Sequence, residues 1–235
     1  MIDMKYRSDE REIMDDFTLE GDRLRVNLDI LASINKWLGG NQISLQGIQE
    51  LLHAYPVGRK FVIADLGCGN GDMLRKVSKL GDQLGFQFTL IGIDANPDTI
   101  NYAKELSTEF KNISYMQMNI FSKEFDEITY DIALSTLFLH HLKDEEIIGK
   151  LNQLNKNARI GIIVNDLHRS QLAYFLFSIV SFFINNKIIR NDGLVSIRRG
   201  FKKQELINFS NQLNAKSDIG WRWAFRYQWI MKTKI

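Results

Sequence analysis

Two kinds of hydrophobic pattern divide the chain. Near the N-terminus, apolar residues recur at every third or fourth position, and this face consists of Leu24, Leu28, Leu31, Ile34 and Leu38. That spacing predicts an amphipathic helix that ends at Gly39-Gly40. A second helix is expected at about 45–54. The chain therefore begins with helices, and the strands are expected farther on.

Short runs rich in β-branched and aromatic residues follow, and helical segments separate most of them. The runs occupy residues 61–66, 88–94, 113–118, 131–136 and 159–166. This alternation is typical of a parallel sheet with crossover helices on both faces. After a helix expected at 203–213, runs at 219–225 and 227–235 stand close together, which predicts an antiparallel hairpin at the sheet edge. We expect a doubly wound α/β fold with a mostly parallel, seven-stranded sheet.

Composition places few limits on this picture. A chain of 235 residues with 45% hydrophobic and 25% charged residues is typical of one ordinary globular domain. The first residues are too charged for the apolar part of a signal peptide, so we expect a cytoplasmic protein. Cys68 is the only cysteine, which excludes an internal disulfide and a cysteine-clustered zinc site. No histidines and carboxylates have metal-ligand spacing, and no metal is expected.

Charge is uneven along the chain although the total is only +2. Residues 185–235 hold 11 Lys and Arg against 3 Asp and Glu, a local excess of +8. One interpretation is a solvated face. The other is a surface that meets an anionic acceptor or a membrane, so the sequence is compatible with peripheral membrane contact.

The stretch IADLGCGNGDML, residues 63–74, suggests the ligand. A glycine loop between a strand and a helix is the ligand-binding corner of doubly wound folds. A dinucleotide site would have its third glycine at 72, where this chain has Asp72. Asp65 at the end of the strand would oppose a pyrophosphate and favour a ligand with positive charge. S-adenosylmethionine fits, because it has an ammonium group, a sulfonium group and no phosphate.

Asp94 ends the next expected strand, where an acidic side chain can bind the hydroxyls of a ribose. It indicates a nucleoside without choosing between the two cofactors. The alternative is that the glycines only satisfy the geometry of a tight turn. The whole pattern, D-x-G-x-G-x-G after one strand and an acid after the next, favours the cofactor site.

With this pattern, the chain resembles the class I S-adenosylmethionine-dependent methyltransferases over essentially its whole length. The resemblance implies that Asp65 and the glycines line the methionine half of the cofactor and that Asp94 holds the ribose. It places Asn119 beside the adenine, where an aspartate is more usual. The complete expected cofactor set is Asp65, Gly67, Cys68, Gly69, Gly71, Asp94, Ala95, Asn96, Asn119, Ile120 and Leu137.

The resemblance also suggests how the domain is divided. We expect one methyltransferase domain over 1–235, with an N-terminal helical lid at 1–57 and a Rossmann-like core at 58–235. An apolar helical insertion is expected in the core at about 168–200. The lid is expected to fold over the cofactor, because its first helix stands just upstream of the core.

The residues after the fourth expected strand bear on the acceptor. They lack the Asn/Asp-Pro-Pro-aromatic loop of amino-group methyltransferases and the catalytic cysteine of cytosine C5 methyltransferases, so no nucleic acid is expected. The LHHL motif at 139–142 resembles the small-molecule branch, including quinone-biosynthesis enzymes. Two adjacent histidines on a helix or strand are not expected to face one site. His141 is the one favoured here.

Further candidates follow the fifth expected strand. His168 is the favoured general base, since histidine titrates near physiological pH; the alternative is a helix cap. The apolar run 172–184 is too short to span a bilayer, which takes about 20 residues. It predicts either a buried core helix or an aromatic wall of the acceptor pocket that includes Phe175. Arg198 and Arg199 are expected to face an acceptor carboxylate or phenolate.

Together these features predict a small-molecule methyltransferase. The acceptor is expected to be a hydroxyl or an activated ring carbon of a small apolar aromatic compound. Several short motifs further resemble bacterial methyltransferases of quinone and polyketide pathways, which act on phenolic or enolic rings. The alternatives are a dinucleotide-dependent oxidoreductase and a non-catalytic S-adenosylmethionine-binding protein. The oligomeric state stays open.

Overall fold

The computed structural model describes residues 3–16, 19–213 and 215–233. The expected lid segment 1–57 and the expected last strand 227–235 therefore each include positions outside the described residues. The N-terminal part contains a short 3-10 helix, η1 (Ile13–Asp15), and the helices α1 (Gly21–Trp37) and α2 (Gly40–Leu52). Helix α1 matches the expected one. Helix α2 begins about five residues earlier than expected, because Gly39 takes a positive φ of +71° and turns the chain at once.

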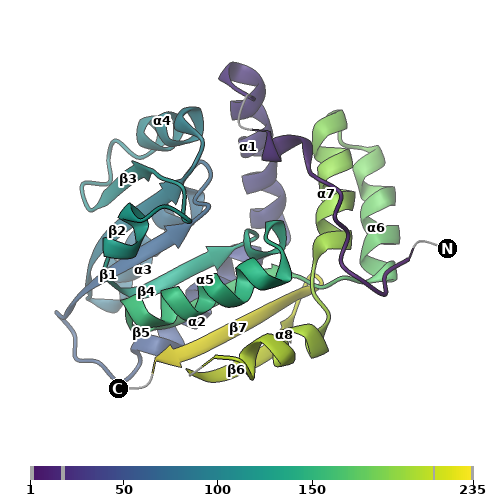
Figure 1. Ribbon diagram of the computed structural model, residues 1–235. Helices are drawn as coiled ribbons and strands as arrows, with labels where there is room; N and C mark the ends of the chain where they lie inside the picture. The colour runs from purple at the N-terminus through teal and green to yellow at the C-terminus, as the bar shows by residue number, and fades with distance from the viewer. Residues whose placement is uncertain (1–2, 17–18, 214, 234–235) are drawn as a thin grey trace.

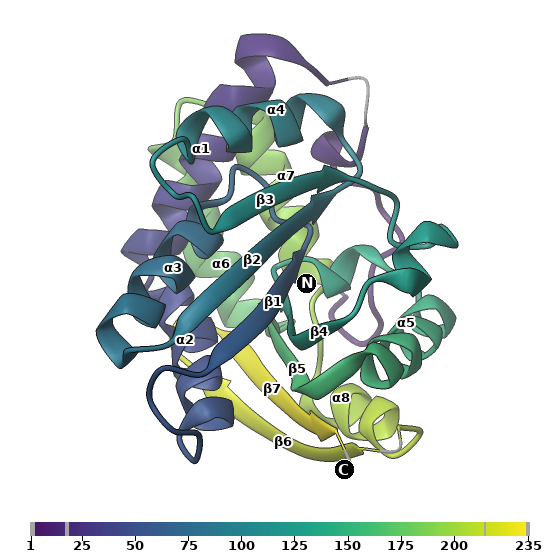
Figure 2. The same cartoon turned by 90° about the vertical axis from the view of Figure 1, so that its left-hand side faces the viewer.

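A seven-stranded sheet forms the centre of the molecule (Figures 1 and 2). Its strands run in the order β3-β2-β1-β4-β5-β7-β6. The first five are parallel, and β7 pairs antiparallel with both β5 and β6. The predicted fold class is confirmed, including the hairpin at the edge. The strands are β1 (Lys60–Leu66), β2 (Gln87–Asp94), β3 (Ile113–Gln117), β4 (Tyr130–Thr136), β5 (Ala158–Leu167), β6 (Ala215–Arg222) and β7 (Arg226–Thr233).

Helices cover both faces of the sheet and create two hydrophobic cores. On one face lie α2, α3 (Asp72–Leu84) and α4 (Pro97–Leu106). On the other lie η2 (Glu124–Glu127), α5 (Asp144–Asn157) and α8 (Lys203–Ser210). Buried residues of α3 recur at Met73, Val77 and Leu80, which is the spacing of one helical face. The sheet is thus a rigid platform whose strands β1, β2, β4 and β5 end at one common edge.

A third layer stands at that common edge. It consists of α1, the pair α6 (Gln171–Phe182) and α7 (Lys187–Arg199), and the short helix η3 (Leu139–His141). The N-terminal segment, residues 3–16, runs past α7 (Figure 1). It is bound to α7, since the backbone N–H of Ser8 donates to the carbonyl of Arg198 at 3.1 Å. This layer faces the ends of the parallel strands, where doubly wound folds bind ligands.

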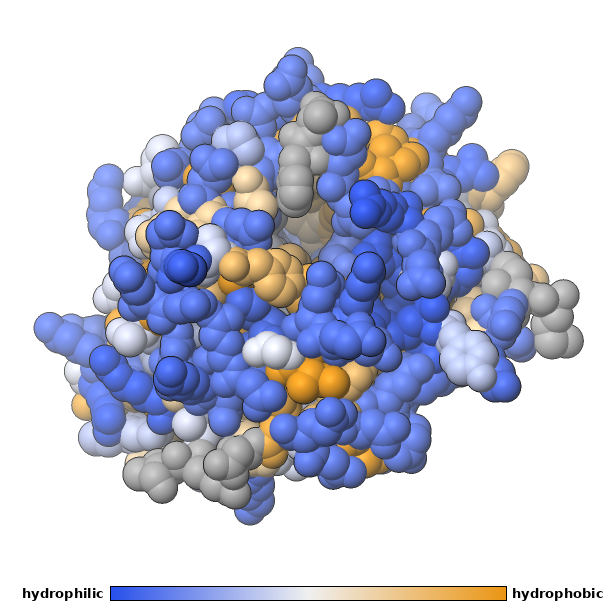
Figure 3. Space-filling view, viewed as in Figure 1, coloured by the Kyte–Doolittle hydropathy of each residue, from blue (hydrophilic) through white to orange (hydrophobic). Residues whose placement is uncertain are grey.

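Helix α6 is mostly exposed, so the expectation of a buried core helix is wrong. Its buried residues are Ala173 and Ser181, and Phe177 packs where Gly193 of α7 leaves room. Because α7 is the main neighbour of α6 among the described elements, most of the apolar side chains of α6 face outward. Figure 3 shows apolar surface near the upper end of this pair on an otherwise mainly hydrophilic face. The exposed residues are Leu172, Phe175, Leu176, Ile179, Val180, Phe182 and Phe183.

Candidate active site

The loop between β1 and α3 contains three glycines with positive φ angles, Gly67 at +65°, Gly69 at +52° and Gly71 at +77°. A Cβ at position 67 would lie 2.3 Å from Cδ2 of Phe138, and one at 71 would lie 2.0 Å from Oη of Tyr115. At Gly69 the nearest atom of the described residues would be 3.8 Å away, an ordinary contact. Packing therefore accounts for Gly67 and Gly71, whereas the backbone at Gly69 is open to a ligand.

Asp94 ties this loop to the end of β2. The backbone N–H of Gly69 donates to Oδ2 of Asp94 at 3.3 Å, and that of Asn96 donates to Oδ1 at 3.0 Å. The backbone N–H groups of Gly67 and Cys68 both donate to the carbonyl of Ile93, at 2.9 and 3.1 Å. A carboxylate offers about four acceptor positions, so Asp94 can still accept from a ligand hydroxyl.

Asp65 and Asp94 are neighbouring carboxyl groups near the ends of β1 and β2. Asp65 is 2% exposed, and its Oδ1 has no hydrogen-bond partner among the described residues. Burial, with the neighbouring charge of Asp94, raises the pKa of Asp65 to about 8. Burial also raises the pKa of Asp94, although backbone N–H groups oppose that shift. A cation bound between them would relieve both effects, whereas a phosphate would worsen them.

The other expected cofactor residues surround the same loop. Asn96 is buried and caps α4, where its side chain accepts from the backbone N–H groups of Asp98 and Thr99. Asn119 is exposed, and its Oδ1 accepts from the N–H of Phe121 at 2.9 Å, so this amide stabilises its own turn. The remaining members lie at strand ends or in the loop, namely buried Cys68 and Ile120 and partly buried Ala95 and Leu137.

Helix α1 crosses beside the glycine loop and is held there by polar contacts. Asp29 accepts from Nδ2 of Asn70 at 3.0 Å and from the hydroxyl of Tyr102 at 2.6 Å. Leu28 is the neighbour nearest to Gly69. Trp37, at the end of α1, is 79% exposed. The helix thus contacts the loop through its middle, and Trp37 in its last turn points outward.

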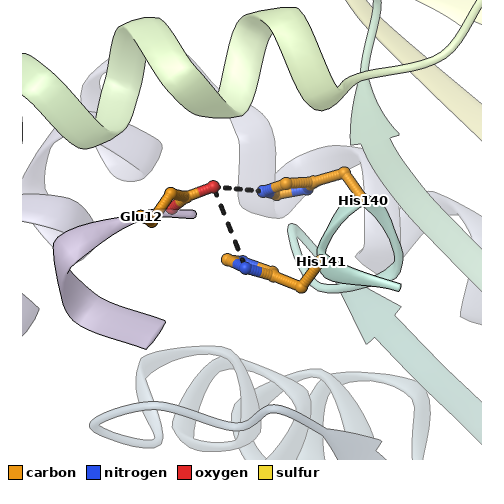
Figure 4. A group of neighbouring side chains, drawn as sticks. All are labelled: Glu12, His140 and His141. Carbon is orange, nitrogen blue, oxygen red and sulfur yellow. Dashed lines mark ion pairs between the residues drawn. The ribbon is translucent and has the colours of Figure 1, made fainter. Parts of the chain in front are cut away.

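Both adjacent histidines face one group, so the expectation that only one could do so is wrong (Figure 4). They lie in the 3-10 turn η3 after β4, in neither a regular α-helix nor a strand, and their ring centroids are 4.2 Å apart. Oε1 of Glu12 lies 3.4 Å from Nε2 of His140 and 3.8 Å from Nδ1 of His141. Sequence spacing did not indicate Glu12, because its partners stand about 130 residues away.

Two carboxylates stand behind this pair of histidines. Nδ1 of His140 lies 2.6 Å from Oδ1 of buried Asp166, which also accepts the backbone N–H of His140 at its other oxygen, at 3.1 Å. Oδ1 of Asp15 lies 2.7 Å from Nδ1 of His141. His141 also contributes to the electrostatic environment of Asp94 and lowers the pKa of that carboxyl. The histidine turn and the glycine loop are therefore neighbours.

Two arginines fix the backbone of the turn. Arg7 donates to the carbonyls of His140 and Leu142, both at 2.8 Å. Arg199, which is 8% exposed, donates to the carbonyls of His140 and His141 at 3.2 and 2.6 Å and pairs with Asp15 at 2.7 Å. Arg199 thereby connects α7, η1 and η3.

For Glu12, Asp15, His140 and Asp166, the charged neighbours shift the pKa in the direction opposite to burial. Burial by itself would lower the pKa of His140, but Asp166 and Glu12 raise it to about 9. Burial would raise the pKa values of Glu12 and Asp166, but the two histidines lower both. The pKa of Asp15 is likewise lowered, by His141 and Arg199 against burial. The carboxylates of the group are therefore ionised at neutral pH.

His168 follows β5 and lies in a different part of the third layer. Its Nδ1 accepts from Nε1 of Trp221 at 3.3 Å, and burial, Lys202 and Arg169 lower its pKa. No hydrogen bond or ion pair among the described residues links it to Glu12 or to the glycine loop. It lines a cavity of about 600 Å³. The other lining residues are Asp3, Met4, Lys5, Ser170, Gln171, Leu172 and Lys202.

The helix-cap alternative for His168 is wrong, because Oγ of Ser170 caps α6 by accepting from the N–H of Ala173. The expected substrate contacts are also dispersed. Arg198 pairs with Glu10, and Phe175 is 60% exposed on α6. Roles for His168, Arg198 and Phe175 toward an acceptor stay predictions.

Comparison with known families addresses the core of the fold. The sequence profile of a family described as a methyltransferase domain matches residues 63–161, which run from β1 into β5. This stretch of the chain is similar to methyltransferase domains. The match includes the glycine loop, Asp94 and the histidine turn, so both halves of the candidate site lie in the stretch that is similar to methyltransferase domains.

Curated relatives agree with this assignment. The protein-lysine N-methyltransferase EFM4 of Saccharomyces cerevisiae is 32% identical over 148 residues, which are 60% of this chain and 61% of that protein. The carboxy-S-adenosyl-L-methionine synthase of Helicobacter pylori is 26% identical over 48% of this chain and 46% of its own length. The chain thus spans about half to three fifths of the length of the curated relatives it matches.

Solved structures show the same fold over nearly the whole chain. The plantazolicin methyltransferase BpumL, solved in complex with SAH, covers 94% of this chain and 93% of its own, with a TM-score of 0.65 and 18% identity. An O-methyltransferase family protein from Burkholderia thailandensis covers 95% of this chain and 63% of its own, with a TM-score of 0.68 and 10% identity. These comparisons support the predicted class I methyltransferase and its cofactor; they leave the small-molecule branch unconfirmed.

Membrane contact is addressed by one further finding. Among the helices in the described part of the chain, none is both long and apolar enough to cross a bilayer. The expectation of peripheral contact is not tested.

Proposed function

We propose that this chain transfers the methyl group of S-adenosylmethionine to a hydroxyl or an activated ring carbon of a small, apolar aromatic acceptor. The observation that supports the cofactor most directly is the desolvated carboxylate pair Asp65 and Asp94 beside the open backbone at Gly69. This pair favours the ammonium and sulfonium groups of the cofactor and opposes the pyrophosphate of a dinucleotide.

In this proposal the cofactor lies along the ends of β1 and β2. Asp65 and the loop from Gly67 to Gly71, with Cys68, contact the methionine half, and Asp94 accepts from the ribose hydroxyls. Ala95 and Asn96 lie beside the sugar, Asn119 and Ile120 beside the base, and Leu137 near the sulfonium. Residues 1–57 act as the lid, and the contacts of Asp29 in α1 with Asn70 and Tyr102 support that role.

The acceptor then lies between the glycine loop and the histidine turn. The N-terminal segment covers this place, since Arg7, Glu12 and Asp15 all contact η3. A covered site favours a small acceptor over the surface of a folded protein. Transfer to a hydroxyl forms an O–C bond as the S–C bond breaks; the electron pair stays on sulfur, giving S-adenosylhomocysteine, and the hydroxyl proton is released. Positioning of the two reactants supplies much of the rate.

A second acceptor class comes from the yeast relative, whose name specifies protein lysine. A lysine amine would need a channel to the site past the N-terminal segment, which contacts η3 through Arg7, Glu12 and Asp15. The small acceptor is therefore the function that we favour.

The test is a screen with S-adenosylmethionine labelled in the methyl group. Phenols, quinols and a lysine-rich peptide would be incubated separately with the protein, and products would be located by mass spectrometry. We expect methylation of a small aromatic compound, strongly reduced in an Asp94→Asn variant. Methylation of the peptide alone would support the second acceptor class. Calorimetry that shows binding of NADH but not of S-adenosylmethionine would overturn the proposal.

A further inference from the structure

Three buried acceptor atoms converge where the N-terminal segment meets η3 (Figure 4). They are Oε1 of Glu12, Nε2 of His140 and Nδ1 of His141, and all lie within 4.8 Å of one another. None of the three makes a hydrogen bond with the described residues, although Nδ1 of His141 lies 2.7 Å from Oδ1 of Asp15. Glu12 and His140 are 9% and 2% exposed. Buried polar atoms without partners are rare in folded proteins, so this group calls for a ligand.

We propose that Glu12, His140 and His141 bind one divalent transition-metal ion of the zinc type. Zinc bonds to histidine nitrogen and carboxylate oxygen measure about 2.0–2.2 Å, which places two ligands of a tetrahedral ion about 3.3 Å apart. The glutamate oxygen lies 3.4 and 3.8 Å from the two histidine nitrogens. Small side-chain movements bring such a trio into ligand geometry. Two histidines and one glutamate are also a donor set that zinc uses in enzymes.

Asp166 prepares His140 for this role. Because a carboxylate only accepts, Nδ1 of His140 carries the proton directed at Oδ1 of Asp166, 2.6 Å away. When a metal ion displaces the proton of Nε2, that nitrogen presents its lone pair on the side of Glu12. A carboxylate that orients a histidine in this way is the usual support of a metal-bound imidazole.

The local charge also favours a cation. Glu12, Asp15 and Asp166 are three carboxylates, whereas two arginines reach the group: Arg199 pairs with Asp15, and Arg7 donates to the carbonyl of His140. Asp15 is unsuited to share the ion with His141, since its Oδ1 lies 2.7 Å from Nδ1, closer than two ligands of one tetrahedral ion. It is therefore the matched control, a carboxylate of the same group that is not a ligand.

The role of this ion in catalysis rests on the proposed function, whereas binding of the ion does not. Three protein ligands leave the fourth position of a tetrahedral ion for water or substrate. An acceptor hydroxyl bound there becomes more acidic and loses its proton to water, because the ion stabilises the oxyanion. That oxyanion then forms the O–C bond as the S–C bond of the cofactor breaks, with the electron pair left on sulfur.

The experiment measures Zn²⁺ binding to the full chain after treatment with EDTA. We expect calorimetry and metal analysis to give one Zn²⁺ per chain, and Co²⁺ to give the visible absorption of a tetrahedral site. Glu12→Ala and His141→Ala should each weaken binding by at least about tenfold, on the scale of changes near metal ligands. Asp15→Asn and His53→Ala should keep wild-type stoichiometry, the latter because His53 is an exposed histidine outside the group.

Several outcomes would decide against the proposal. One is that the wild type binds no stoichiometric Zn²⁺, and another is that the Glu12→Ala variant binds Zn²⁺ as tightly as the wild type. Either result would mean that the two histidines are protonated side chains and not metal ligands. Circular dichroism on each variant shows whether a loss of binding is a loss of fold; Glu12 lies outside the sheet, which keeps that variant informative. Cofactor binding and methyl transfer, each measured with EDTA-treated and with Zn²⁺-loaded protein, separate the two proposals. Protein that binds Zn²⁺ but not S-adenosylmethionine contradicts the proposed function. Methyl transfer that is unchanged without the metal contradicts the role of the ion in acceptor activation.

Discussion

The glycine loop and the histidine turn lie side by side but are built in opposite ways. The loop takes its shape from backbone, with positive φ angles at Gly67, Gly69 and Gly71 and N–H groups that donate to β2. The turn takes its shape from side chains that arrive from distant segments, with Glu12 and Arg199 meeting His140. Backbone geometry can be encoded locally, whereas a cluster of charges requires the whole fold.

This difference predicts different consequences of substitution. Changes in the loop should affect folding and cofactor binding together, because the same backbone serves both. Changes in the turn should affect acceptor chemistry while the cofactor still binds.

The largest effect is expected from Gly67→Ala. The positive φ costs about 1–2 kcal/mol, and the clash with Phe138 adds overpacking of about 1–3 kcal/mol. Urea denaturation should show a loss of roughly 2–5 kcal/mol in the free energy of unfolding. Gly58→Ala is the matched control, with a φ of +84° but no atom within 4 Å, and should show only the strain. Equal losses in the two variants would contradict the role of packing at Gly67.

The pH dependence of the free energy of unfolding should reveal the raised pKa of Asp65. The unfolded carboxyl releases its proton near the ordinary value of 3.8, whereas the folded carboxyl keeps it until about pH 8. The folded state therefore binds more protons in between, and stability falls as pH rises, by about 1.4 kcal/mol per pH unit from this group. Asp65→Asn should remove this decline between pH 5 and 7, a difference of about 3 kcal/mol in denaturation curves. Parallel curves for the two proteins would show that Asp65 ionises normally.

Two variants, one in each region, test whether the glycine loop and the histidine turn act independently. Asp94→Asn should weaken S-adenosylmethionine binding by about 1.5–3 kcal/mol, or roughly 10- to 150-fold, the range for hydrogen bonds to a charged group. Arg199→Lys removes the planar fork that holds the two histidine carbonyls and Asp15. It should leave cofactor affinity nearly unchanged in calorimetry and lower methyl transfer. A loss of cofactor affinity from Arg199→Lys would mean that the regions are not independent.

The smallest effect is expected at the end of α1, the helix that we propose to be part of a lid. Trp37 is 79% exposed, so Trp37→Ala should change the free energy of unfolding and cofactor affinity by less than about 0.5 kcal/mol. Leu28→Ala, on the part of α1 next to Gly69, should weaken cofactor binding by about 1 kcal/mol through lost apolar contact. The reverse order in calorimetry would place the working surface of the lid at its last turn.

The sheet and the glycine loop could be predicted from sequence because both follow from local patterns. Alternating strands and helices indicate a mostly parallel sheet, and three glycines after a strand indicate the turn; the strand order was not predicted. Asp94 could be found because it ends the strand next to β1. These features depend on residues close together in the chain or on strands with regular connections.

The histidine turn could be predicted only in part. The pair His140-His141 was visible, but a 3-10 turn lets both rings meet Glu12, which no helical or strand spacing indicates. Helix α6 shows the same limit in another form. Its apolar sequence predicted burial, yet only the packing of α6 against α7 determines how much of it is covered.

The contacts of the N-terminal segment bear on the order of folding. Ile13 donates to Asp192, Glu10 pairs with Arg198, and Arg7 donates to the carbonyl of Arg199, so each contact closes a loop of about 180–190 residues. Loops of this length carry a large entropy of closure and form late. The sheet and its glycine loop can therefore be complete before Glu12 reaches the histidines. During refolding, recovery of cofactor binding should precede recovery of catalysis.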